Sequence, residues 1–162
     1  MTFFLKNEGI VCYIATGMGQ LLTPQQIEQI SVCLQRDSKV EAAYLFGSIA
    51  RGKSHAGSDV DIALVLSRYV SPDDFSDYRI RLSVTFSEIV RRNVDLVIFN
   101  QVSPILKHQI LLEGQRIYER PDRLARNQEA LAMVQYFDFL PIFERCKEGM
   151  FRKIKERASG AT

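Results

Sequence analysis

The chain has 162 residues, of which 46% are hydrophobic and 25% charged, and its formal net charge is +2. This length and balance are typical of one compact globular domain that buries a core without disulfides. The small net charge argues against direct nucleic-acid binding, and no apolar run approaches the roughly 20 residues that span a bilayer. Cys12, Cys33 and Cys146 are few and widely spaced, which predicts a reduced, cytoplasmic setting without a zinc site.

Residues 1–20 contain apolar patches that are interrupted by Lys6, Asn7 and Glu8. A signal peptide would instead have a basic start followed by a continuous apolar stretch. We therefore expect this segment to be a peripheral, poorly ordered N-terminal extension that precedes the folded core.

Caps, breakers and apolar spacing predict alternating helices and strands along the rest of the chain. Thr23 and Pro24 are typical of the start of a helix, and the short apolar run at 40–46 stops at Gly47, as a strand would. In chain order, we expect a helix to residue 36, a strand at 40–46, a turn entering a short helix at 47–52, a loop at 53–58, a strand at 59–66, a helix at 71–92, a strand at 94–99, a helix at 103–114, an edge strand at 115–119 and a helical segment at 122–157 that kinks or breaks at Pro141.

The strand at 59–66 is apolar on both faces, as expected for a central strand that is covered on both sides. The order of elements predicts an α/β fold of the α+β kind, with a small mixed β-sheet flanked by helices. We assign residues 21–120 to the core and 121–162 to a C-terminal helical segment that packs on the core or on a partner. A flavodoxin-like, doubly wound domain fits the same alternation of elements.

Acidic residues stand inside two of these apolar strands. Asp59 and Asp61 share one face of their strand, with α-carbons about 6.5–7 Å apart, and Asp95 begins the next strand. If the strands are neighbours, three carboxylates meet at one end of the sheet, where they repel one another unless a cation compensates them. Magnesium prefers such oxygen ligands, and two ions would clamp the oxygens of a phosphoryl or nucleotidyl transfer. The alternative is that the acids cap strands and pair with arginines.

A glycine and a serine, Gly47 and Ser48, stand where the preceding strand ends and a helix begins. Backbone N–H groups at such a turn favour phosphate, the hydroxyl can donate to a phosphate oxygen, and glycine permits close approach. A Gly-Ser pair alone is common at strand-to-helix turns and carries little information. Arg51 either neutralises charge on the phosphates or pairs with a nearby acid.

The combined segment "GSIARGKSHAGSDVDIAL" resembles the signature of the DNA polymerase β-type nucleotidyltransferases. Together with "VDLVIFNQVSPILKHQILLEGQRIYER", it is similar to the minimal nucleotidyltransferases, the MNT or MntA-like antitoxins, from about Tyr44 to Arg120. The resemblance implies a polymerase β-like nucleotidyltransferase fold that binds a nucleoside triphosphate and magnesium. It implies that Gly47 and Ser48, and less firmly Arg51, hold the nucleotide.

By the same resemblance, Asp59 and Asp61 ligate two Mg²⁺ ions. Asp95 ligates the catalytic ion and helps to deprotonate the incoming hydroxyl. Antitoxins of this family transfer AMP from ATP to a tyrosine of a helical HEPN-type ribonuclease toxin, which implies the same activity and partner here. Two alternatives are an antitoxin that only masks the toxin by binding, and a nucleotidyltransferase that modifies a small molecule such as an aminoglycoside.

Several other residues allow a structural and a functional interpretation. For Lys107, His108 and Arg116 we favour a structural role, and loop polarity explains Lys53 and His55. The C-terminal segment is rich in large apolar side chains, which we expect to cover the protein's own sheet. A face that binds a partner or a second copy is the alternative. The apolar residues concerned are Phe137, Phe139, Leu140, Ile142, Phe143, Met150, Phe151 and Ile154.

Overall fold

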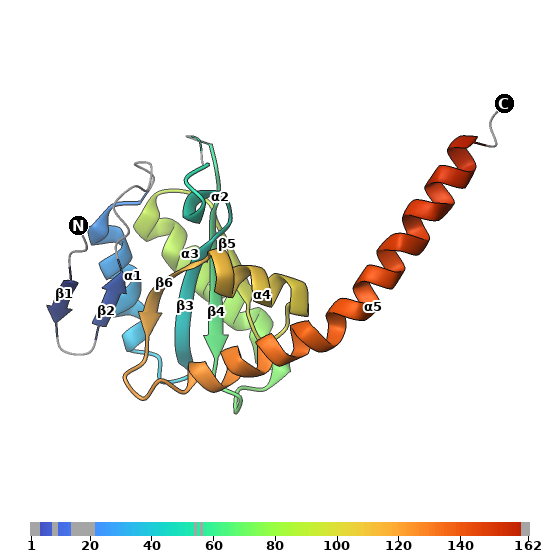
Figure 1. Cartoon of the computed structure of the whole chain (residues 1–162). Coiled ribbons are helices and arrows are strands. Elements are labelled where there is room, and N and C mark those ends of the chain that lie inside the picture. The colour runs from blue at the N-terminus through green and yellow to red at the C-terminus, as the bar shows by residue number, and fades with distance from the viewer. Residues whose placement is uncertain (1–3, 8–9, 14–21, 54, 56, 160–162) are drawn as a thin grey trace.

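The structure is a computed structural model that describes residues 4–7, 10–13, 22–53, 55 and 57–159, with side chains for 22–53, 55 and 57–155. The folded body alternates helices and strands in the predicted order (Figure 1). The elements are β1 (Phe4–Asn7), β2 (Ile10–Tyr13), α1 (Pro24–Gln35), β3 (Val40–Phe46), α2 (Gly47–Ala50), β4 (Val60–Leu66), the 3₁₀ helix η1 (Pro72–Asp74), α3 (Phe75–Val90), β5 (Val94–Ile98), α4 (Pro104–Glu113), β6 (Gln115–Glu119) and α5 (Ala125–Ser159).

The main sheet has four strands in the order β5-β4-β3-β6. The strand β3 is antiparallel to both β4 and β6, whereas β4 and β5 are parallel. The predicted small mixed sheet is therefore confirmed, with β4 as a central strand and β6 at the edge. The flavodoxin-like interpretation is wrong, because the two central strands of this sheet run in opposite directions.

Alternate side chains of the central strands supply two separate cores. On one face, Leu45 and Ile62 lie in a cluster with buried residues of α1 and α3. On the other face, Tyr44 and Ala63 lie in a cluster with buried residues of α4 and the start of α5. Because successive strand residues point to opposite faces, this alternation places one helical layer on each side of the sheet.

Capping residues set the starts of the flanking helices as their sequence predicts. At α1, the Thr23 side chain accepts from the Gln26 amide, and the Gln26 side chain accepts from the Thr23 amide. At α4, the Ser103 side chain accepts from the amide of Leu106, and Pro104 occupies the first turn. These bonds satisfy N–H groups that would otherwise lack partners at a helix start.

Of the predicted N-terminal extension, the described parts are β1 and β2, which pair as an antiparallel hairpin separate from the four-stranded sheet. The remainder of residues 1–20 lies outside the described residues. Within the described chain, no helix is both long enough and apolar enough to cross a membrane.

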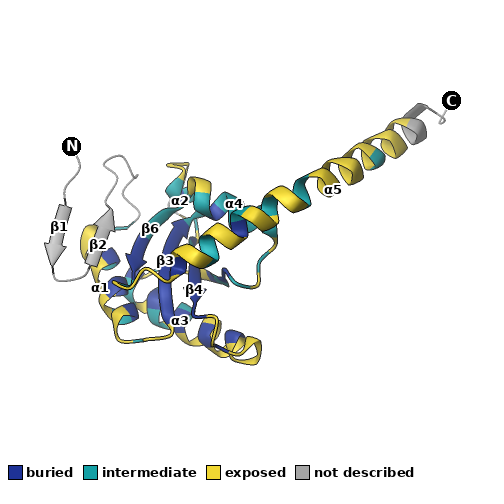
Figure 2. Ribbon diagram, turned by 60° about the horizontal axis from the view of Figure 1, so that its bottom comes forward, coloured by how far each residue is buried: buried dark blue, intermediate teal, exposed yellow. Residues whose placement is uncertain are grey.

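The helix α5 is continuous through Pro141, so of the predicted kink or break, the break is wrong. Its first part lies across the body, and its second part projects away from the body (Figures 1 and 2). Proline removes one backbone hydrogen bond. Pro141 lies in an exposed stretch where water can satisfy the freed carbonyl, so the proline does not force the helix to end.

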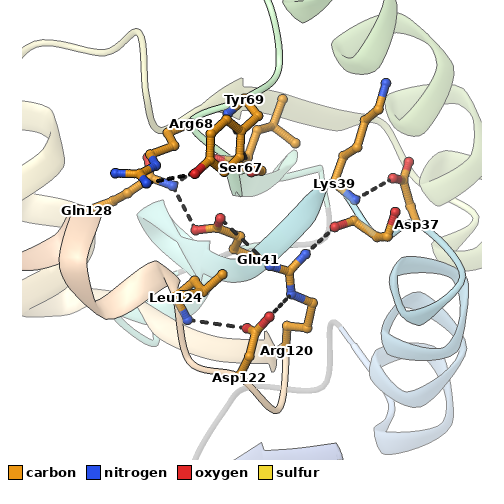
Figure 3. Close-up of polar contacts among 12 residues, drawn as sticks. Asp37, Lys39, Glu41, Ser67, Arg68, Tyr69, Arg120, Asp122, Leu124 and Gln128 are labelled. Carbon is orange, nitrogen blue, oxygen red and sulfur yellow. Dashed lines mark hydrogen bonds and ion pairs between the residues drawn. The ribbon is translucent and has the colours of Figure 1, made fainter.

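A buried polar network fixes the start of α5 to the sheet (Figure 3). The amide of Gln128 donates to the carboxylate of Glu41 at 2.8 Å and to the carbonyl of Leu66 at 2.7 Å. Asn100 donates to Gln128 at 2.6 Å, which links the chain after β5 to the same point. The Glu41 side chain is buried, so these bonds hold α5 at the end of the sheet where β3 begins.

Candidate functional site

Two of the predicted acids lie side by side at the other end of the sheet. The parallel pairing of β4 with β5 sets Asp61 directly opposite Asp95. The antiparallel pairing of β3 with β4 sets Phe46, the last residue of β3, opposite Asp61. The end of β3 and the starts of β4 and β5 therefore meet, which confirms that the strands bearing Asp61 and Asp95 are neighbours.

The turn after β3 is packed directly against Asp61. Gly47 has a φ of +72°, a conformation that residues with a side chain rarely adopt. A Cβ atom at this position would overlap the Asp61 carboxylate. The backbone N–H of Ser48 donates to that carboxylate. The Gly-Ser turn and the D-x-D segment, separated in sequence by a loop, thus form one unit.

Electrostatics at this unit favour a bound cation. Burial raises the pKa of the Asp61 carboxyl above its usual value, and the negative charges of Asp95 and Asp59 raise it further. The Ser48 N–H and the Arg51 guanidinium act in the opposite direction without cancelling the rise. The cluster therefore has more negative charge than its surroundings neutralise, and a divalent cation would relieve the repulsion.

Asp59 lies just before β4 and is exposed, as is Asp95. The amide of Asn93 donates to the Asp59 carboxylate at 3.1 Å and so limits its orientation. Asn93 was not among the residues predicted from the sequence, where it stands two positions before Asp95. Among the side chains that the structure describes, no three His, Cys, Asp or Glu groups are already close enough to hold a metal. Asp95 is exposed, and a cation that draws in Asp59 would compete with its bond from Asn93.

Arg51 follows α2 and pairs with Glu113 of α4 at 3.2 Å, with both side chains 40% exposed. Its charge also reaches Asp61, whose pKa it lowers. Arg51 therefore interacts both with Glu113 and with the acidic cluster around Asp61. An ion pair this exposed contributes little to stability, so the pair leaves Arg51 available to an anionic ligand.

The remaining sequence candidates have structural contacts. His108 stacks on Tyr136 of α5, with ring centroids 3.8 Å apart. Lys107 donates to Gln135 at 3.2 Å, and burial lowers its pKa. Arg116 donates to the Tyr44 hydroxyl and to Glu129, as described below. The favoured structural role is therefore supported for all three.

In the loop before β4, Lys53 and His55 are exposed. The Nδ1 atom of His55 accepts from the Gly57 amide at 3.2 Å, and its own amide donates to the Ser58 hydroxyl at 2.9 Å. These bonds are local to the loop, so they give His55 a role in shaping the turn that leads to Asp59.

A second cluster that the sequence did not reveal joins β3, β6 and α5. The Tyr44 hydroxyl donates to Glu129 at 2.6 Å and accepts from Arg116 at 2.6 Å, and Arg116 contacts Glu129 at 2.7 Å. Burial and the hydrogen bond to Glu129 raise the pKa of the Tyr44 hydroxyl. This cluster holds α5 on the body and lies apart from the Asp61 unit.

Two curated proteins match the chain in sequence. A protein adenylyltransferase, MntA, of Shewanella oneidensis is 30% identical over 97 residues, which cover 58% of this chain and 67% of that protein. A putative protein adenylyltransferase of Methanocaldococcus jannaschii is 34% identical over 75 residues, which cover 46% of this chain and 76% of that protein.

Solved structures match over a longer part of the chain at lower identity. A crystal structure of a toxin–antitoxin with AMP-PNP gives a TM-score of 0.60 at 20% identity, covering 83% of this chain and 99% of that one. A crystal structure of the toxin–antitoxin MntA–HepT gives a TM-score of 0.56 at 19% identity, covering 82% of this chain and 99% of that one. At these identities the likeness concerns the fold.

The family described as polymerase beta, nucleotidyltransferase matches residues 28–123, from α1 to the residues that follow β6. This range contains the Gly-Ser turn, the D-x-D segment and Asp95, and it spans more than half of the 162 residues. The chain belongs to the polymerase β nucleotidyltransferase family, and its resemblance to the minimal nucleotidyltransferases is confirmed.

Proposed function

We propose that this protein is a cytoplasmic antitoxin that transfers AMP from ATP to a hydroxyl, that of a tyrosine, on a HEPN-type ribonuclease toxin. The observation that carries the proposal is the pairing of Asp61 with Asp95 beside the Gly47–Ser48 turn. The two matching curated proteins are named as protein adenylyltransferases, one of them putative, which favours a protein acceptor over an antibiotic.

The residues at this sheet end fit magnesium and a triphosphate. Carboxylate oxygens are the ligands that Mg²⁺ prefers, and the repulsion that raises the pKa of Asp61 is what a cation would relieve. We assign Asp59 and Asp61 to two Mg²⁺ ions and Asp95 to one of them. When bound, the ions supply positive charge to the phosphate oxygens. Gly47, Ser48 and Arg51 would bind the phosphates themselves.

The chain's own groups can then perform the transfer. The tyrosine oxygen attacks the α-phosphorus of ATP, a new phosphorus–oxygen bond forms, and the bond to the β-phosphate oxygen breaks to release pyrophosphate. The proton of the attacking hydroxyl goes to Asp95, whose exposed position makes it accessible to a large acceptor. Ser48 and Gly47 keep the triphosphate in line with the attacking oxygen.

The test is incubation with ATP labelled at the α-phosphate, magnesium and the HEPN-type protein encoded beside this gene. We expect label to move to that protein and the transfer to disappear in Asp59→Ala/Asp61→Ala. The matched control is Asp73→Ala/Asp77→Ala, which removes two exposed carboxylates from the other end of the sheet and should transfer normally.

Other outcomes contradict the proposal in distinct ways. If Asp59→Ala/Asp61→Ala inhibits the toxin as well as the unchanged chain does, the antitoxin acts by masking. If label moves to an aminoglycoside and not to the toxin, the acceptor is a small molecule.

A further inference from the structure

The helix α5 carries an apolar face from Ala125 to Ile154 that is interrupted near its start, where Gln128 and Glu129 bond to the sheet. In its first part, this face is covered, because Ala125 and Ala132 are buried and Tyr136 stacks on His108 of α4. The same face continues beyond Tyr136 at intervals of three and four residues, which keep side chains on one side of a helix. The continuation consists of Phe139, Leu140, Phe143, Cys146, Met150, Phe151 and Ile154.

Beyond Tyr136, Phe139 and Leu140 are half-buried, and from Phe143 onward the large apolar side chains of this face are exposed. We call residues 137–155 of α5 the distal helix; it projects from the body in both views (Figures 1 and 2). Phe143 is 40% exposed, and Met150 and Phe151 are each 58% exposed. The expectation that these side chains cover the protein's own sheet is therefore wrong from Phe143 onward. Such an uncovered apolar surface is typical of a protein–protein interface.

The width of the apolar face indicates what covers it. At about 100° per residue, the face spans roughly 140° of the helix circumference, and of the residues in this sector only Lys147 is charged. The seam of a two-stranded coiled coil is narrower, since it uses only two positions in seven. Pairing with a second copy would leave Leu140 and Phe151 at the margin of the contact, whereas a groove between two helices would cover the whole sector.

We propose that the distal helix is the docking element for a helical partner protein that presents an apolar groove between two of its helices. The inference rests on the proposed function in one respect, because it identifies that partner with the HEPN-type toxin. The apolar face from Phe139 to Ile154 would enter the groove with Phe143 and Met150 at the centre of the contact. The body, with the Asp61 unit, would then be tethered beside its acceptor.

The test is titration calorimetry, which measures the Kd of the full chain for the HEPN-type protein encoded beside this gene. Phe143→Glu/Met150→Glu should weaken binding at least ~100-fold, because both side chains are placed at the centre of the interface. The matched control is Phe137→Glu, which alters a side chain of the same helix that is 60% exposed and lies roughly 120° from Phe143. This control should bind within about threefold of the unchanged chain.

Circular dichroism should show that each variant keeps its helical content, because the changed side chains are exposed.

The outcomes separate this inference from the proposed function. Asp59→Ala/Asp61→Ala should bind the toxin as the unchanged chain does, even though it transfers no AMP. If Phe143→Glu/Met150→Glu binds normally, or if the unchanged chain does not bind the toxin, the docking proposal is overturned. A dimer of the chain alone in sedimentation, lost in Phe143→Glu/Met150→Glu, would instead assign the face to a second copy. Failure of AMP transfer with normal, Phe143-dependent binding would overturn the proposed function alone.

Discussion

The Asp61 carboxylate fills the space that a Cβ atom on Gly47 would occupy, so the turn and the acidic strand can approach only because residue 47 has no side chain. This contact joins the segment proposed to bind phosphates to the segment proposed to bind metal. It predicts that a single methyl group at Gly47 would disturb both.

Gly47→Ala should lower AMP transfer at least ~100-fold. It should also lower the free energy of unfolding by more than the about 1–2 kcal/mol that backbone strain alone costs. The matched control is Gly52→Ala. Gly52 also has a positive φ, +65°, but a Cβ there would meet nothing within 4 Å. Gly52→Ala should therefore lower the free energy of unfolding by the backbone strain alone and transfer AMP normally. Equal transfer by the two variants would contradict the role of the Gly47–Asp61 contact.

Tyr44→Phe should destabilise the fold by about 1–2 kcal/mol, because it removes a buried hydroxyl that bonds both Glu129 and Arg116. Urea denaturation measures the change. Tyr69→Phe serves as the control, since the Tyr69 side chain is 79% exposed and its hydroxyl accepts from Arg68 at the surface. Its effect should stay below about 0.5 kcal/mol. A loss in Tyr44→Phe no larger than that of the control would show that the cluster does not hold α5.

Glu119 should make stability depend on pH in the acidic range. Burial pushes the pKa of this carboxyl up, but hydrogen bonds from Arg126 and Arg116 outweigh burial and bring it below its ordinary value of 4.5. A lowered pKa in the folded state contributes stability that is present above about pH 4.5 and is lost as the pH falls through the folded-state pKa.

Urea denaturation from pH 7 to pH 3 tests this dependence. Glu119→Gln should be less stable than the unchanged chain by about 1–3 kcal/mol at pH 7, and the difference should shrink toward pH 3. Glu113→Gln removes the charge from an exposed carboxylate that pairs with Arg51 and accepts from Gln109 at 3.5 Å, and it should change stability by less than about 0.5 kcal/mol. A difference between Glu119→Gln and the unchanged chain that stays constant with pH would contradict the assignment.

Local signals predicted most of the fold. The cap at Thr23, the proline at 104 and the two-sided apolar pattern of 60–66 determine elements through neighbouring residues, and these elements lie where expected. Contacts between residues that are far apart in the sequence have no such local signal. Tyr44 and Glu129 are far apart in the chain, and their hydrogen bond depends on how α5 crosses the sheet. The apolar content of α5 predicted burial but could not show that only its first part reaches the body.

For the candidate site, spacing alone predicted that Asp59 and Asp61 share one strand face, and the structure places Asp61 in β4 and Asp59 just before it. The position of Asp95 required the order of strands, because two parallel strands are adjacent only through the topology of the sheet. The overlap between Gly47 and Asp61 required coordinates, since the loop between them leaves their separation open. The hydrogen bond from Asn93 to Asp59 likewise could be found only from coordinates.

Thermal unfolding with ATP and magnesium, separately and together, tests most directly whether this sheet end binds a metal–nucleotide complex. Binding to the native state alone should add about 2.7 kcal/mol when the ligand is 100-fold above its Kd. We predict that Tm rises with ATP and magnesium together and that Asp61→Asn, which removes one negative charge from the cluster, abolishes the rise. No rise at millimolar concentrations of both, or an equal rise in Asp61→Asn, would contradict the account.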